Sequence, residues 1–144
     1  MMAVVFEGRR AAHESQRWNE LRKRYGVDGD GETVVTCNGK LLRAARSLRL
    51  RRHSPDGFEW GYGGSGPAQL ALALLLEYFD HVGQPAGTDW ALNLYQTFKF
   101  RVVGRLAHDA WILSGAQIGG AVADIIADSS EQEREAWAAG GPPP

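Results

Sequence analysis

The sequence predicts an α+β fold, in which two long helices pack on one face of a small, mostly antiparallel sheet and a shorter C-terminal helix follows. Two observations predict this class. Short β-prone runs near the start of the chain are joined by tight-turn residues, and long segments in the second half carry apolar residues at helical spacing. The chain has 144 residues, which suits one domain with one core. We expect that domain over residues 1–128, followed by an acidic segment and a Gly/Pro tail over residues 129–144.

The first predicted strands form a hairpin. Residues 3–7 contain a β-prone run and are expected to be the first strand. Thr33–Cys37 are a second strand, and the following Asn38-Gly39 pair accepts the positive φ angles of a type I′ turn. Lys40–Leu42 would then be the short return strand.

Three more short extended segments are expected further along the chain. Residues 47–51 alternate leucine with arginine. A period of two predicts a strand with leucines inward and arginines outward. Residues 58–60 and residues 111–113 are also interpreted as brief strands.

The two long helices follow a glycine-rich loop. Pro67 suits the first turn of an apolar, well-buried helix over residues 67–81. Apolar residues at helical spacing predict a second helix over residues 88–106. Ser114 and Gln117 have the spacing of a capping box and predict the start of a third, shorter helix.

Composition restricts the classes of protein that this chain could belong to. Apolar residues make up 44% of the chain and charged residues 23%, as in an ordinary globular protein. The single Cys37 excludes an intramolecular disulfide and a zinc cluster built from several cysteines. The first ten residues do not resemble a signal peptide, and the longest apolar run, residues 70–76, is too short for a membrane span. We therefore expect a cytoplasmic protein that does not associate with membranes.

Basic residues are concentrated between residues 40 and 52. This stretch contains six Lys or Arg residues and no acid, although the net charge of the whole chain is −1. Such a run is a candidate interaction patch for an acidic surface or for the phosphates of a nucleic acid. The alternative is a solvated surface that the acidic second half of the chain balances. The candidate patch consists of Lys40, Arg43, Arg46, Arg49, Arg51 and Arg52.

A glycine-rich loop before the first long helix is the most informative stretch. Glycines leave backbone N–H groups uncovered, and together with the N-terminus of the next helix these groups can hold an anion. The alternative, which we favour, is a tight turn that brings a buried helix close to the sheet. The candidate ligand loop consists of Gly61, Tyr62, Gly63, Gly64, Ser65 and Gly66, with His53 and Glu59 nearby in sequence.

Known glycine motifs do not fit this loop. Gly61, Gly63 and Gly66 match G-x-G-x-x-G, but a second long helix follows where a dinucleotide fold needs a parallel strand. A Walker loop is excluded because no Lys-Ser/Thr pair follows the last glycine. Pro67 occupies the position of the final glycine of a nucleophile elbow, which argues against Ser65 as a nucleophile.

We expect neither a catalytic group nor a metal. His53, Glu59 and Ser65 could form a His-acid-Ser arrangement for hydrolysis, but a structural role for His53 and Glu59 as hydrogen-bond partners of the loop is favoured. The four histidines are interpreted as lacking metal-ligand spacing, such as an acid four residues away. No cofactor is expected.

A long motif surrounds the loop. It reads His53-Ser54-Pro55-x-Gly57-Phe58-Glu59-Trp60-Gly61-Tyr62-x-Gly64-Ser65-Gly66-Pro67-x-Gln69-Leu70-Ala71. This motif resembles that of an uncharacterised bacterial family, a domain of unknown function that occurs in chromosomes, phages and other mobile elements. The resemblance covers about residues 33–118, with residues 3–9 as a further strand and residues 11–27 as an insertion. It implies a small accessory protein and no particular activity.

The function that we expect is non-enzymatic binding to a protein or nucleoprotein partner, with nucleic acid as a candidate through the basic patch. The genomic context of the resembled family suggests a counter-defence inhibitor that docks on a nucleic-acid-guided immune complex. The competing hypothesis is binding or hydrolysis of an anionic or nucleotide ligand at the glycine loop.

Overall fold

The computed structural model describes residues 3–10, 33–54 and 57–138. It confirms the α+β class. Four antiparallel strands form one sheet in the order β3-β2-β1-β4, and the predicted insertion over residues 11–27 lies outside the described residues. The strands are β1 (Val5–Arg10), β2 (Thr33–Cys37), β3 (Lys40–Leu41) and β4 (Ala110–Ser114).

The predicted hairpin is present between β2 and β3. Asn38 and Gly39 have φ angles of 49° and 80°, as the central residues of a type I′ turn require. The Asn38 side chain also accepts a hydrogen bond of 2.8 Å from the Val5 backbone N–H. This bond fixes the hairpin against the start of β1.

The central strand is close to an aromatic cluster. Gly8 on β1 lies opposite Trp111 on β4, and a Cβ atom at Gly8 would lie 2.3 Å from the Trp111 ring. Only glycine at position 8 therefore leaves room for the Trp111 ring to lie over β1. The Trp111 ring in turn meets Trp60 edge-on, with 5.5 Å between ring centroids.

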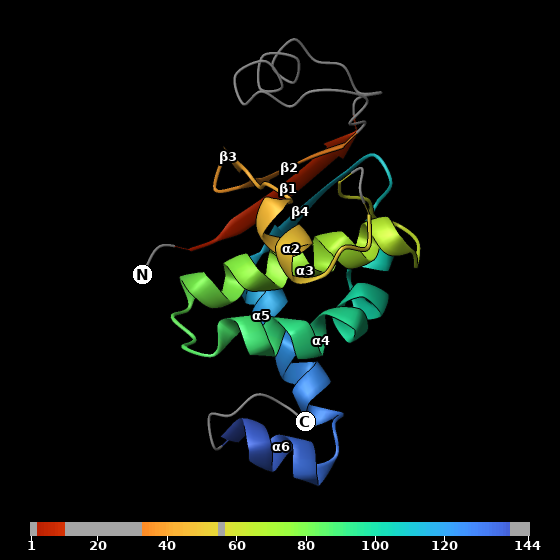
Figure 1. Ribbon diagram of the computed structural model, residues 1–144. Coiled ribbons are helices and arrows are strands. Elements are labelled where there is room, and N and C mark those ends of the chain that lie inside the picture. The colour runs from red at the N-terminus through yellow and green to blue at the C-terminus, as the bar shows by residue number, and fades with distance from the viewer. Residues whose placement is uncertain (1–2, 11–32, 55–56, 139–144) are drawn as a thin grey trace.

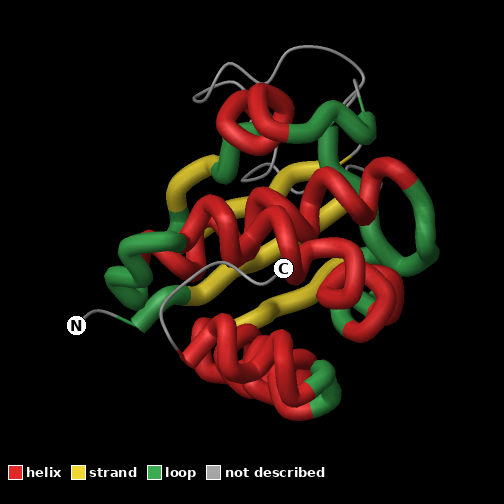
Figure 2. Tube along the Cα trace, turned by 60° about the horizontal axis from the view of Figure 1, so that its bottom comes forward, coloured by secondary structure: helices red, strands yellow, loops and turns green. Residues whose placement is uncertain are grey.

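Helices cover one face of the sheet (Figures 1 and 2). Figure 1 shows α3 between the sheet and α4, which explains why every residue from Gly66 to Leu76 is buried. No helix in the described part of the chain is both long and apolar enough to span a membrane. The helical elements are α2 (Ala45–Leu50), α3 (Ser65–His81), α4 (Gly87–Arg101), a 3-10 turn η1 (Val103–Arg105), α5 (Gly115–Ala127) and α6 (Glu131–Ala138).

The predicted strand over residues 47–51 is wrong, because this segment belongs to the short helix α2. Ser47 explains the difference. It is 1% exposed, and its hydroxyl donates to the Ala44 carbonyl at 2.9 Å and accepts from Gln69 Nε2 at 2.8 Å. These buried contacts hold a helical turn against α3. The pattern of two leucine–arginine alternations is short, and the buried contacts outweigh its preference for a strand.

One more predicted strand is wrong, and the other predictions differ from the structure mainly at element ends. Residues 58–60 form no strand. The second long helix ends at Arg101, and η1 then turns the chain toward β4. The strand predicted at 111–113 is β4, and the Ser114–Gln117 capping box is confirmed. Part of the acidic segment forms α6, while residues 139–144 lie outside the described part.

Candidate functional site

The glycine loop is held by close backbone contacts. Gly61 has a φ of +86° and donates its N–H to the Val103 carbonyl at 3.1 Å. A Cβ at Gly66 would lie 2.5 Å from Glu59 Cβ, and one at Gly64 would lie 2.6 Å from the Tyr62 ring. The positive φ of Gly61 and the close approach of Gly66 to Glu59 thus favour glycine at these two positions even without a ligand. This supports the interpretation as a structural turn.

The polar residues near the loop have separate partners. His53 Nε2 lies 2.6 Å from the Tyr95 hydroxyl, and no hydrogen bond joins it to Ser65 in the described part of the chain. Glu59 Oε1 pairs with Arg10 at 2.6 Å. Arg10 also donates to the His108 carbonyl at 2.6 Å and lies over the Trp60 ring at 4.9 Å. His53 and Glu59 therefore each link the segment before the loop to another part of the fold, while Ser65 is exposed.

Four residues of the basic patch surround one hollow of about 570 Å³. It lies between the β2–β3 hairpin, α2 and the C-terminal part of α3. The patch residues Arg51 and Arg52 are exposed but lie outside its lining. We call this hollow the basic pocket; its lining includes Lys40, Arg43, Arg46 and Arg49, together with Cys37, Glu77 and His81.

One ion pair borders the basic pocket. Arg46 on α2 pairs with Asp80 on α3, and both side chains are partly exposed, at 38% and 54%. The hydrogen bond to Asp80 raises the pKa of Arg46 above its ordinary value. Arg46 therefore stays charged and links α2 to the end of α3 across the pocket.

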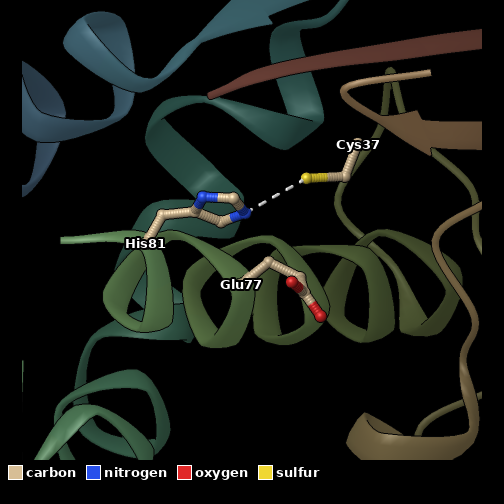
Figure 3. A group of neighbouring side chains, drawn as sticks. All are labelled: Cys37, Glu77 and His81. Carbon is tan, nitrogen blue, oxygen red and sulfur yellow. Dashed lines mark hydrogen bonds between the residues drawn. The ribbon is translucent and has the colours of Figure 1, made fainter. Parts of the chain in front are cut away.

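Three side chains of different chemistry line the same pocket, and Figure 3 shows them close to one another. Cys37 Sγ lies 3.7 Å from His81 Nε2. One donor atom each from Cys37, Glu77 and His81 lies within 4.8 Å of the other two. All three residues are half-buried. Burial, and then the neighbouring Glu77 carboxylate, raise the pKa of the Cys37 thiol.

The expectation that no histidine has an acid four residues away is wrong, because Glu77 and His81 have this spacing on α3. The sequence contained that signal. It contained no signal for Cys37, which is 44 positions from His81 and reaches it only because the hairpin lies beside α3.

The fold and its pocket define a class of small α+β proteins with one antiparallel sheet covered by helices on one face. Within this class the chain belongs to DUF6166, a family of unknown function, whose match covers residues 24–124. The matched range includes the basic pocket and the glycine loop, but neither β1 nor α6. No curated protein and no solved structure matches the chain.

Proposed function

We propose that this protein acts by binding, and that the basic pocket docks on the phosphate backbone of a nucleic acid or nucleoprotein partner. The observation that carries the proposal is the pocket itself. Four cationic side chains from the hairpin, the link that follows it and α2 line one hollow, although they are scattered over ten residues of sequence. Convergence on a hollow distinguishes a binding surface from a merely solvated run of charges.

Arginine chemistry favours phosphate as the ligand. Five of the six basic residues between 40 and 52 are arginines. The planar guanidinium matches phosphate oxygens with two parallel hydrogen bonds. Lys40, Arg43 and Arg49 are exposed and so are accessible to a large partner. The only helix among the patch residues, α2, has six residues, too few to read several bases, so we expect binding that is independent of sequence.

A binding role agrees with the geometry at the glycine loop. His53 and Glu59 are engaged with Tyr95 and Arg10, and this supports bracing more than chemistry at Ser65. A counter-defence role would be one biological use of docking on a nucleoprotein.

The test is fluorescence anisotropy with a short single-stranded DNA at several salt concentrations. Each phosphate neutralised on a single strand contributes about −0.7 to the slope of log K against log salt. The triple variant Lys40→Gln, Arg43→Gln, Arg49→Gln should reduce the magnitude of the slope by about 2, as three lost phosphate contacts predict.

A matched control removes the same charge elsewhere. The triple variant Arg9→Gln, Arg101→Gln, Arg105→Gln changes exposed arginines outside the basic pocket and should keep the wild-type slope. Equal slopes for the two triple variants would show that only net charge matters. Wild-type protein that does not bind DNA, but binds an acidic protein through the same residues, would also contradict a phosphate partner.

A further inference from the structure

We propose that Cys37, Glu77 and His81 form a zinc site at the edge of the basic pocket. The inference concerns metal binding and does not depend on the binding of a nucleic acid. It is carried by three donor groups from two elements, whose donor atoms lie within 4.8 Å of one another.

The distances suit tetrahedral zinc. A Zn–S bond of about 2.3 Å and a Zn–N bond of about 2.0–2.1 Å place sulfur and nitrogen roughly 3.5 Å apart at a tetrahedral angle. The observed separation of Cys37 Sγ and His81 Nε2 is 3.7 Å. Figure 3 shows the thiol and the imidazole directed toward each other, with Glu77 beside them on the same helix as His81. Glu77, whose nearest donor atom lies within 4.8 Å of the other two, would complete a three-ligand set after its side chain turns toward them.

The supporting elements are rigid. Glu77 and His81 lie one turn apart on α3, the helix whose preceding turns are buried. Cys37 ends β2, directly before the Asn38-Gly39 turn that a hydrogen bond ties to Val5. The two halves of the site are therefore held by the fold, and little ordering is needed when an ion binds.

The charges also balance. A thiolate and a carboxylate together neutralise a divalent ion, so the occupied site carries no net charge beside Arg46 and Lys40. No hydrogen bond or ion pair joins the Glu77 carboxylate to another residue in the described part of the chain, although its charge acts on the nearby Arg46 guanidinium. Thiolate, imidazole and carboxylate are all ligands that zinc takes, and the thiolate disfavours magnesium and calcium.

Three protein ligands leave one coordination position of a tetrahedral ion. The same three residues line the basic pocket, whose lining also includes cationic side chains. Water or an anionic oxygen of a bound partner would suit the remaining coordination position.

The experiment titrates the untagged, metal-free full-length chain with Co²⁺ and records its absorption spectrum. Cys37 is the only cysteine in the chain, so a thiolate-to-cobalt charge-transfer band reports on this site alone. We expect a band that saturates at one equivalent and disappears when Zn²⁺ is added. Cys37→Ser should abolish the band, and His81→Ala and Glu77→Gln should weaken cobalt binding.

The control is His108→Ala, which removes an exposed histidine outside the cluster and should leave the titration unchanged. A second measurement is independent of spectra: Zn²⁺ should raise the Tm of the wild type and not that of Cys37→Ser, because only the native site binds the ion. Absence of a charge-transfer band in the wild type, or equal cobalt binding by the wild type and His81→Ala, would overturn the proposal. Those outcomes would leave Cys37 and His81 as an ordinary hydrogen-bonded pair.

Discussion

At the scale of single residues, close packing accounts for Gly66 in the glycine loop. Gly66 begins the buried part of α3, and its backbone faces Glu59. Glu59 cannot retreat easily, because its carboxylate is paired with Arg10, whose side chain is 9% exposed. Any side chain at position 66 must therefore displace Glu59, which its ion pair with Arg10 holds in place.

Gly66→Ala should lower the free energy of unfolding by on the order of 1–3 kcal/mol, as overpacking a fixed contact typically does. The matched control is Gly120→Ala on α5, where a new Cβ meets nothing within 4 Å. That change should instead stabilise the protein by up to about 1 kcal/mol through helix propensity. Urea unfolding of both variants measures the difference. Equal effects of the two substitutions would show that the Glu59 contact does not constrain position 66.

Residue-level roles were only partly predictable from the sequence. Glu77 and His81 are four residues apart, so once residues 67–81 are predicted to be a helix, the two side chains are expected to lie on the same face. The partners of Glu59 and His53 are not, because Arg10 and Tyr95 lie 49 and 42 positions away. Local spacing predicts contacts within one helix, whereas contacts between elements depend on the packing.

At the scale of elements, α5 and α6 begin with the same type of N-terminal cap but differ in how they pack against the core. Ser114 and Gln117 exchange hydrogen bonds at the start of α5, which buries Ile118, Val122 and Ile125. Ser130 and Glu133 make the same exchange at the start of α6. In the overall view α6 lies at the far end of α5 from the sheet (Figure 1).

Ser114→Ala should therefore reduce global stability by about 1 kcal/mol, the usual effect of removing an N-cap. Ser130→Ala should fray α6 and leave the global transition almost unchanged, since local opening there need not disturb the core. Thermal unfolding together with amide hydrogen exchange separates the two effects. A Tm that falls equally in both variants would mean that α6 belongs to the cooperative core.

The elements also show why one prediction failed. The α3 and β2 assignments rest on long or strongly β-prone patterns and are confirmed. The α2 segment has only six residues, and its alternating leucines suggest a strand as readily as a helix. Its conformation is decided by the buried Ser47–Gln69 contact, which joins residues 22 positions apart and has no local signature.

At the scale of the whole molecule, the basic residues and the cluster of Cys37, Glu77 and His81 lie in one corner of the fold. This corner is formed by the β2–β3 hairpin, α2 and the end of α3. The hairpin brings Lys40 and Cys37 to one side of the basic pocket, and α2 brings Arg46 and Arg49 to the other. The composition of this patch was readable from the sequence. Its shape was not, because the sequence suggested a flat, strand-borne stripe of arginines where the structure has a hollow beside α3.

The central claim is that this corner, and not the glycine loop, contacts the anionic partner. NMR titration of the ¹⁵N-labelled full-length protein with a short single-stranded DNA tests it most directly. We predict salt-sensitive amide shifts over residues 40–50 and at the end of α3 near His81, with Gly61–Gly64 unaffected. Shifts confined to the glycine loop, or no shifts at any salt concentration, would contradict the account.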